Sequence, residues 1–532
     1  MGEDVHLVCQ ENHPDRYDFI AGAMLHRRDG SSVTTLSRET PFPGKCVLHQ
    51  PELDGTLPVF VWDKYEEYSR VVPMVDLSTA EIEAYIERNV AVVSELVGAE
   101  RITGIHANHA VLMPTVALRV KALAGTPFTL MPHGSDIEYA VKKDDRFLRY
   151  ASAAFEEARR IFVIGDEMRG RVLKVFAGVP ELESKLSDLH LGVDTSDFEP
   201  LVPEDRGRNI ADLSASLAPL PRGKSAAQEA EMLRALPGVR DLDGLLATLA
   251  AASRYDGKRP DEMADSKLLT VPWTMAPTLL FVGRLIAWKG IQSLIAALPL
   301  AIEREPALRT VVVGHGPLRE AMEAMVWALQ NGRRDLVEMI ANNGGALEGT
   351  ADSAHGESSL GEVTSFYADL AKQERLDAYY ETARRVFTRE SVIFTGYLTH
   401  TELRHLFPCC DVGVFPSVVR EAGPLVFLEA LASGCFPLGT YFGGMAASID
   451  AVGEEIAPDI AEIMKLDPKN TVADLARKIP RALEEAPRYR EVFARLARER
   501  YDWSSVSSRF LREMDATRAS EIHLSSSGRR NA

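Results

Sequence analysis

Cysteine is scarce in this sequence, and long apolar runs are absent. The 532 residues include only five cysteines (Cys9, Cys46, Cys409, Cys410 and Cys435) and no CxxC pair, which predicts reduced core thiols rather than disulfides or a metal site. No run of 18 apolar residues occurs, so we expect no transmembrane helix. The opening "MGEDVHLVCQ" has neither the charged nor the apolar region of a secretory signal, so we expect a cytoplasmic protein.

An excess of positive charge is also missing. The formal net charge is −17 and the pI is near 5.4, which argues against a nucleic-acid-binding protein because such proteins usually carry a basic surface. Lysine and arginine concentrate in "VKKDDRFLRY" and "EEARRIFVIGDEMRGRVLK". These stretches predict solvated helix faces. The alternative is a patch for anionic lipid or acceptor phosphate, which would bring the protein peripherally to a membrane.

What is present is a regular alternation of short apolar runs with helical patterns. "STAEIEAYIERNVAVVSELVG" predicts one such helix, with Ser78 and Glu81 as a capping box and Gly98 as a stop. Strands that alternate with helices of this length favour parallel sheets covered on both faces. The sequence therefore predicts an α/β chain of two doubly wound, Rossmann-like halves, with the ligand between them at the carboxyl ends of the strands.

The alternation is interrupted in two places, and this sets the expected domains. We expect an N-terminal domain over 1–200, a helical insertion or linker over 201–273, and a C-terminal domain over 274–500. The C-terminal domain carries an insertion at about 331–389, whose low-complexity part predicts a mobile loop. A C-terminal helix over 501–516 and a disordered tail over 517–532 complete the chain.

Two carboxylates stand in the nearly apolar segment "REAGPLVFLEALASGCFPLGTYFGG". The preceding strand and the stop at Gly434 place Glu421 in a strand-to-helix loop at the carboxyl edge of the sheet, and Glu429 about a turn and a half into the helix. Carboxylates accept hydrogen bonds from the paired hydroxyls of sugars and ribose. Alternatively, Glu421 pairs with Arg420 or caps the helix, and Glu429 lies on a solvated face.

At this point the chain resembles the retaining GT-B glycosyltransferases, most closely glycosyltransferase family 4. The resemblance is carried by an ordered set of motifs: "MPHGSD", "GVDTSDFEP", "FVGRLIAWKG", "VVGHGP", "FTGYLTHTEL", "EAGPLVFLE", "EALASGCFP" and "FGG". It covers roughly residues 5 to 200, 277 to 328 and 390 to 515. It implies a GT-B fold, in which two Rossmann-like domains face each other across a cleft.

Arg284 and Lys289 follow a strand and the glycine Gly283 in "FVGRLIAWKG". Two cations there are suited to neutralise a nucleotide diphosphate as it leaves, without a metal. Surface cations at a helix start are the weaker alternative, because positive charge at that end opposes the helix dipole.

The resemblance implies roles for the remaining donor residues. Glu421 would act as a catalytic residue that holds the hydroxyls of the donor hexose, and Glu429 would bind the ribose. Past Gly423, the backbone N–H groups of Leu425 and Val426 would face phosphate or sugar.

Histidines in the N-terminal half complete the predicted site. By resemblance, His133 in "PHG" is a catalytic residue that touches the donor sugar near the reacting carbon. His106, Asn108 and His109 in "HANH" are weaker candidates for the acceptor side, with a structural role as the alternative; a metal pair at that spacing on a strand is not expected.

The resemblance implies a retaining transfer of a hexose from a nucleotide-diphosphate sugar to a sugar, glycan or lipid-linked acceptor, with no further cofactor. The alternatives are a catalytically silent nucleotide-sugar-binding protein, or an inactive fragment, and, less favoured, a nucleotide-sugar epimerase. Two departures from the family pattern lie at the sugar pocket: "EAGPLV" replaces E-x-F-G-L/I, and "GGMAASID" has no nearby glutamate. The sequence therefore does not distinguish UDP-, GDP- and ADP-sugars.

The family pattern also begins with a strand, a glycine-rich loop and a helix that precede the strand matching "DVHLVCQ", which here starts at residue 4. Because the first strand of a doubly wound sheet is central, its absence would leave unpaired backbone groups. We expect either a truncated reading frame, or packing of Val5–Gln10 against the "GIHANH" strand to close the gap. If part of 201–273 fills the central position instead, the fold is rewired.

Overall fold

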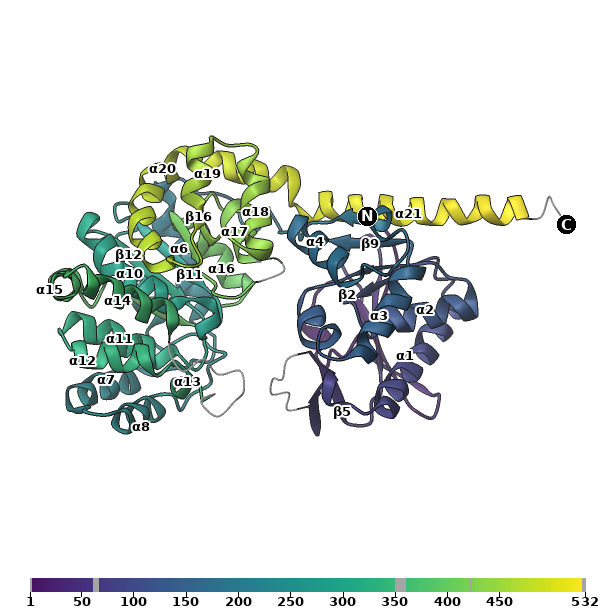
Figure 1. Ribbon diagram of the computed structural model, residues 1–532, viewed down its shortest axis with the longest axis horizontal. Helices are drawn as coiled ribbons and strands as arrows, with labels where there is room; N and C mark the ends of the chain where they lie inside the picture. The colour runs from purple at the N-terminus through teal and green to yellow at the C-terminus, as the bar shows by residue number, and fades with distance from the viewer. Residues whose placement is uncertain (1, 61–66, 350–359, 421–422, 424, 529–532) are drawn as a thin grey trace. The chain divides into compact units, whose positions relative to one another are not determined.

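The computed structural model describes residues 2–60, 67–349, 360–420, 423 and 425–528, with side chains described up to residue 515 (Figure 1). The chain forms two compact units: Met1–Leu189 with Ser508–Ala532, and His190–Ser507. Each unit is built on parallel β-strands with helices between them, so the predicted α/β class is confirmed.

The first unit contains two four-stranded sheets and one strand pair. The first sheet has the order β1 (Val5–Val8), β4 (Cys46–Pro51), β2 (Ile20–His26), β3 (Ser32–Ser37). The second has the order β10 (Leu186–Asp188), β9 (Arg160–Val163), β8 (Phe128–Met131), β7 (Ile105–Asn108), and β5 (Thr56–Val59) pairs with β6 (Arg70–Pro73). All of these pairs are parallel except β2 with β3.

The expected pairing of Val5–Gln10 with the 104–109 strand is wrong. Among the described strands β1 pairs only with β4, and β7 pairs only with β8. Residues 201–273 belong to the second unit and do not fill the gap. The partner of β1 comes from the segment between residues 20 and 51, in which "RRDGSS" forms the β2–β3 turn with Gly30 at φ +86°. That Asp-Gly pair is the sequence signal of a hairpin.

The first long helix begins where the sequence indicates, but it continues through Gly98, so the predicted stop there is wrong. In α1 (Thr79–Ala99) the predicted capping box is confirmed, because the Ser78 N–H donates to the Glu81 carboxylate at 2.8 Å and the Ser78 hydroxyl accepts from the Glu81 N–H. The other helices are α2 (Met113–Ala124), α3 (Asp145–Glu157), α4 (Gly165–Val175) and α5 (Leu182–Lys185). The final helix α21 (Trp503–Gly528) continues past the expected helix end at residue 516.

Three histidines form a hydrogen-bonded row across the first sheet. The ring nitrogens of His6 on β1 and His49 on β4 lie 2.9 Å apart, as do those of His49 and His26 on β2. His49 is 2% exposed, and burial, with the neighbouring His26 and His6, lowers its pKa to about 4. Burial also lowers the pKa of His26. The nearby Glu95 opposes this shift, and Arg88 adds to it.

This row makes the first unit sensitive to acid. The unfolded chain takes up protons on His49 and His26 near pH 6.5, whereas the folded unit does so only at lower pH, so stability is complete above pH 6.5 and is lost as the pH falls toward 4. We expect the free energy of unfolding to fall by about 2–3 kcal/mol over that range. Thermal unfolding followed by circular dichroism measures the slope, and His49→Gln should flatten it; equal slopes would contradict this account.

The second unit contains a six-stranded parallel sheet with the order β13 (Val392–Gly396), β12 (Arg309–Val313), β11 (Thr278–Val282), β14 (Val412–Phe415), β15 (Phe436–Thr440), β16 (Lys465–Leu466). Its helices include α10 (Ile291–Arg304), α11 (Arg319–Gln330), α16 (His400–Leu406), α17 (Leu425–Ala432), α18 (Gly443–Gly453), α19 (Pro458–Met464) and α20 (Thr471–Arg500) (Figure 1). The strand order reverses between β11 and β14. Ligands of doubly wound sheets bind at such a switch point.

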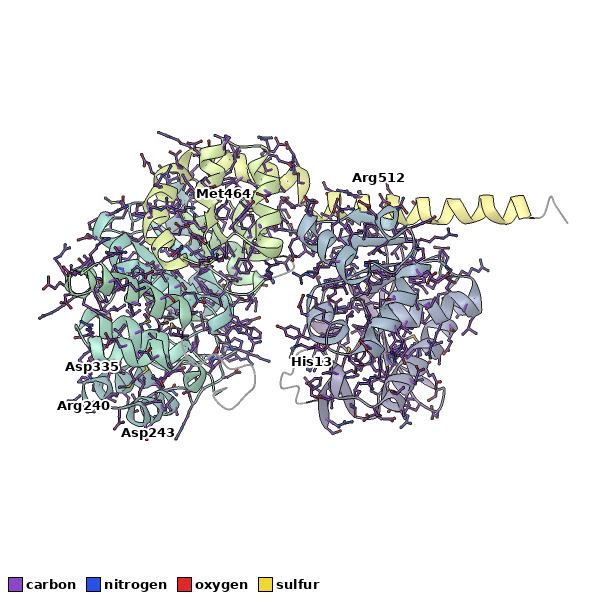
Figure 2. All side chains as sticks on the ribbon, viewed as in Figure 1. His13, Arg240, Asp243, Asp335, Met464 and Arg512 are labelled. Carbon is purple, nitrogen blue, oxygen red and sulfur yellow. The ribbon has the colours of Figure 1, made fainter. Side chains whose placement is uncertain are left out.

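Both interruptions of the alternation are helical and pack together in the second unit. The first contains α6 (Arg206–Leu217), α7 (Ala226–Ala235), α8 (Leu242–Ala252) and α9 (Ala264–Leu269). The second contains α12 (Arg334–Asn342), α13 (Gly344–Leu347), α14 (Gly361–Lys372) and α15 (Leu376–Val386). Arg333 donates to the Val239 carbonyl at 2.9 Å, and the labelled Arg240, Asp243 and Asp335 lie at one end of the unit (Figure 2). Residues 350–359 of the predicted mobile loop lie outside the described residues, and its described flanks include α13 and the start of α14.

The two cation-rich stretches form ion pairs within the first unit. Lys142, Arg146, Arg160, Arg169 and Arg171 each lie 2.5 to 3.2 Å from a carboxylate oxygen. Paired side chains of this kind agree with the prediction of solvated helix faces. Within the part of the chain that the structure describes, no helix has the length and apolarity that crossing a membrane requires.

The five cysteines are free thiols. Cys409, Cys410 and Cys435 are buried in the core of the second unit, where burial raises the pKa of each thiol, while Cys9 and Cys46 are half-buried. The prediction of reduced core thiols is therefore confirmed for the three in the second unit.

Candidate functional site

Loops from three neighbouring strands meet at the switch point of the second unit. After β11 and β12, the Leu285 N–H donates to the His315 carbonyl at 2.8 Å. After β14, the Val418 N–H donates to the Trp288 carbonyl at 2.9 Å. The motifs "GRLIAWKG", "GHGP" and "PSVVREAG" are therefore joined through their backbones at one edge of the sheet.

Glycines make this close approach sterically feasible. A Cβ on Gly290, whose φ is +74°, would lie 1.9 Å from the Pro416 carbonyl oxygen. A Cβ on Gly314 would lie 1.9 Å from the Gly283 carbonyl oxygen. Because real side chains do not tolerate such distances, glycine at these positions is required by backbone contact between the loops, as well as by the positive φ.

The two predicted cations lie on the loop between β11 and α10. Arg284 is exposed, and Lys289 is half-buried in the short 3-10 helix Ala287–Lys289 that precedes α10. The Lys289 side chain lies close to Gly283 at the other end of the loop: a Cβ added to Gly283 would be 3.9 Å from the Cγ of Lys289. The structure thus places Gly283, Arg284 and Lys289 at the switch point. Their binding of phosphate stays a prediction.

Glu429 is buried rather than solvated. It lies in α17, is 4% exposed, and its Oε1 lies 2.8 Å from Nδ1 of His400, the first residue of α16. Its Oε2 is buried and accepts no hydrogen bond from the described residues. The alternative that Glu429 lies on a solvated face is therefore excluded, and the site presents one buried carboxylate oxygen without a partner.

The rest of the "EAGPLV" segment is partly described. Glu421 lies outside the described residues. Gly423 is half-buried, Leu425 is exposed as the first residue of α17, and Val426 is half-buried. Gly434 follows α17 at φ +68°, so the predicted helix stop is confirmed.

Asp411 belongs to the opposite, amino-terminal edge of the same sheet. Its carboxylate lies 2.6 Å from Arg206 and 3.3 Å from Arg490, and accepts from the Thr278 N–H at 2.9 Å. It therefore ties β11, β14, α6 and α20 together, which is a structural role.

A second polar cluster lies at the carboxyl ends of β7 and β8 in the first unit. Nε2 of His133 lies 2.9 Å from the Asn108 Oδ1, and the rings of His109 and His133 are 4.8 Å apart. Asp136 is fully buried beneath them and accepts from the N–H groups of Ala110 at 2.6 Å and His133 at 3.1 Å. Burial lowers the pKa of His133, with a further contribution from His109, so the ring is neutral near pH 7.

His109 and His106 differ in their surroundings. His109 adopts φ +73°, which is uncommon for a residue other than glycine. The centre of its ring lies 4.6 Å from the ring centre of Phe60. His106 instead packs between Thr129 on β8, at 2.9 Å, and Phe510 on α21, at 4.9 Å between ring centres. Burial lowers its pKa to about 4. The structure therefore brings Asn108 and His109 together with His133, and places His106 in the packing under α21.

Two groups of functional interest were not found from the sequence. His400 and Asp136 stand in the quoted motifs "FTGYLTHTEL" and "MPHGSD". Their partners, Glu429 and Ala110, are distant in the sequence, so the spacing of residues within a motif does not reveal these contacts. Among the described residues, no group of three or more His, Cys, Asp or Glu side chains is arranged to hold a metal ion.

A match to a known protein family lies within the second unit. Residues 368–500 match the family described as Glycosyl transferases group 1. An uncharacterized glycosyltransferase of Methanocaldococcus jannaschii is 26% identical over 167 residues, which are 31% of this chain and 28% of that protein. The match therefore spans less than a third of that relative.

Solved structures align over most of the chain at low identity. Sucrose-phosphate synthase from Thermosynechococcus elongatus is 15% identical and aligns over 97% of this chain and 99% of its own, with a TM-score of 0.49. HepE from Anabaena, solved in complex with UDP, is 14% identical and aligns over 80% of this chain and 82% of its own, with a TM-score of 0.45.

The family match covers β13, α16, β14, α17 and α20, and so includes both His400 and Glu429. This part of the chain therefore matches the glycosyl transferases group 1 family, in agreement with the resemblance that the ordered motifs carry.

Proposed function

We propose that the protein is a glycosyltransferase that moves a hexose, with retention, from a nucleotide-diphosphate sugar to a sugar, glycan or lipid-linked acceptor. The observation that carries this proposal is Glu429, a buried carboxylate with one unpartnered oxygen, placed at the switch point within a glycosyl transferases group 1 region. Ribose hydroxyls are the hydrogen-bond donors that such an oxygen suits.

The residues at the carboxyl ends of the strands have different proposed roles in the two units. In the second unit, Arg284 and Lys289 stabilise the negative charge that develops on the diphosphate as the bond to the sugar breaks. Glu421 holds the hexose hydroxyls, and the backbone after Gly423 faces phosphate or sugar. In the first unit, the neutral His133, oriented by Asn108 and by Asp136, touches the donor sugar, while Asn108 and His109 line the acceptor side.

A thermal-shift screen tests donor binding and identifies the nucleotide. UDP, GDP and ADP are compared, since a ligand at 100 times its dissociation constant stabilises the folded protein by about 2.7 kcal/mol. No shift with any of the three would contradict the proposal. Turnover of the matching nucleotide-hexose, with and without acceptors, then separates a transferase from a catalytically silent nucleotide-sugar-binding protein.

Variants of the two glutamates test their separate roles. We expect Glu421→Gln to lower turnover, and Glu429→Gln to weaken nucleotide binding by about 10- to 150-fold, the equivalent of a lost charged hydrogen bond of 1.5–3 kcal/mol. Glu338→Gln is the matched control, because Glu338 is half-buried on α12 and forms an ion pair with Arg334. Unchanged turnover and affinity in both variants would return the segment to a structural role.

A further inference from the structure

His400 occupies a fixed position at the edge of the switch point. It is the first residue of α16, directly after Thr399, which caps the helix; Glu402 accepts the Thr399 N–H at 2.7 Å. This capping box sets the start of α16 and therefore the direction in which the His400 side chain leaves the backbone. The ring reaches Glu429 on α17, with Nδ1 2.8 Å from Oε1.

The two oxygens of Glu429 consequently differ. Oε1 is held by His400, whereas Oε2 is buried without a hydrogen-bond partner among the described residues. A buried acceptor without a donor is unfavourable, and a ligand hydroxyl that donates to it removes that cost. The His400 contact also restricts the rotamers of Glu429, because one carboxylate oxygen must stay within reach of the ring nitrogen.

We propose that His400 is a positioning residue for nucleotide binding, which holds Glu429 so that its free Oε2 accepts a hydrogen bond from a ribose hydroxyl of the bound nucleoside diphosphate. The inference rests on the proposed function of the Glu429 site. It assigns to His400 no contact with the ligand; the ring acts through the carboxylate.

The charges around His400 favour this arrangement. Its side chain is 72% exposed, and the hydrogen bond to Glu429 raises its pKa, so the ring carries a positive charge over a wider pH range than a free histidine. The other described charged groups of α16 are engaged elsewhere: Glu402 caps the helix, and Arg404 lies 3.6 Å from Asp197. Glu429 is thus the charged partner of the ring.

Two substitutions separate positioning from charge. His400→Ala removes the donor, and His400→Asn keeps an N–H group near the place of Nδ1. The probes are the nucleoside diphosphate among UDP, GDP and ADP that raises the unfolding temperature most, and its 2′,3′-dideoxy analogue. We expect His400→Ala to weaken the ribonucleotide by about 3- to 10-fold and the dideoxy analogue by less than about 2-fold, with His400→Asn close to the wild type for both.

The pH profile provides a readout that a purely structural role would not move. Below the raised pKa the ring is charged and its bond to the carboxylate is charge-assisted; above it, only a neutral N–H remains. The penalty of His400→Ala for the ribonucleotide should therefore be larger at pH 6 than at pH 9. The matched control is His405→Ala on the same helix, whose ring bonds Asn209 at 3.0 Å instead, and it should leave both affinities unchanged.

The outcomes distinguish this inference from the proposed function. If the wild type binds nucleotide and Glu429→Gln weakens it while His400→Ala does not, the positioning role is wrong and the proposed site stands. Equal weakening of the ribonucleotide and the dideoxy analogue by His400→Ala would also overturn the role. If no nucleoside diphosphate binds to the wild type, the proposed function itself fails, and the inference fails with it.

Discussion

Replacing Arg319 with alanine is expected to lower the free energy of unfolding of the second unit by about 3–5 kcal/mol. Arg319 is 1% exposed, forms ion pairs with Asp261 and, at 2.5 Å, with Glu323, and its guanidinium lies 4.3 Å from the ring centre of Phe394. Removing the cation leaves the buried Asp261 carboxylate without its ion-pair partner and Glu323 with Lys224 alone. Uncompensated buried charge is the source of the large effect.

The pKa of Glu323 agrees with a tightly paired network, whereas at Asp261 burial outweighs Arg319 and raises the pKa of the carboxyl. Burial alone would raise the pKa of Glu323, but Arg319 and Lys224 lower it to about 2. Lys224, which is 2% exposed, also lies 3.4 Å from Glu320, and Glu320 accepts from the Tyr255 hydroxyl at 2.7 Å. The raised pKa of Arg319 and the lowered pKa of Glu323 keep this pair charged at neutral pH, so the cost of truncation appears there.

Urea unfolding followed by tryptophan fluorescence measures this effect. Four of the five tryptophans lie in the second unit, namely Trp273, Trp288, Trp327 and Trp503, so the signal reports mainly on that unit. The control is Arg334→Ala, since Arg334 is 46% exposed and pairs with Glu338 at 2.8 Å on the surface of α12; it should cost less than about 1 kcal/mol. A loss below that value for Arg319→Ala would show that the network contributes little.

The position of this network gives the first insertion a function in the fold. Lys224, Tyr255 and Asp261 come from residues 201–273, while Arg319 follows the "GHGP" loop of the switch point. The Asp261 N–H donates to the Thr395 carbonyl at 2.8 Å, so the insertion also covers the edge strand β13. The insertion is thus an integral layer of the second unit, and its buried charges hold it against the first turns of α11.

The sequence indicated the elements of the fold more reliably than their contacts. The capping box of Ser78 and Glu81 and the stop at Gly434 depend on neighbouring residues, so local patterns were sufficient to predict them. The partner of β1 was missed because strand pairing in a parallel sheet joins distant segments. The Asp-Gly turn before β3 is a local hairpin signal, and it indicates the pairing of β2 with β3 but not that of β1 with β4.

The same distinction applies to the candidate site. Glu429, Arg284 and Lys289 were found because each stands in a motif, and the strand-to-helix pattern places motifs at one edge of a sheet. The contact of His400 with Glu429 was not predictable, because it depends on how two separate loops leave β13 and β14. Arg319 was also missed, since arginine and glutamate in a helical pattern such as that of α11 ordinarily indicate a solvated surface.

The second large effect is expected from the two cations of the β11–α10 loop. We expect Arg284→Ala and Lys289→Ala each to weaken binding of the preferred nucleoside diphosphate by about 10- to 150-fold, because each removes a charge-assisted contact of about 1.5–3 kcal/mol. The corresponding free nucleoside, which has no phosphate, should bind almost as well to the variants as to the wild type. Calorimetric titration of both ligands at one fixed salt concentration measures the difference.

The rigidity of the loop is the reason for expecting the upper part of this range. Gly290 packs directly on the Pro416 carbonyl, and the Val418 N–H donates to Trp288, so the backbone that carries both cations is fixed before the ligand arrives. A preorganised charge loses little conformational entropy on binding, and it remains aimed at the position where negative charge develops. Arg284→Lys should retain part of the affinity for the nucleoside diphosphate, since it keeps the charge and loses only the planar fork of the guanidinium.

The control is Lys372→Ala, which removes a 76% exposed cation from α14 and should change the affinity for neither ligand. If the nucleoside and the nucleoside diphosphate weaken equally in the Arg284 and Lys289 variants, the loop supports the site without contacting phosphate, and the clamp is wrong.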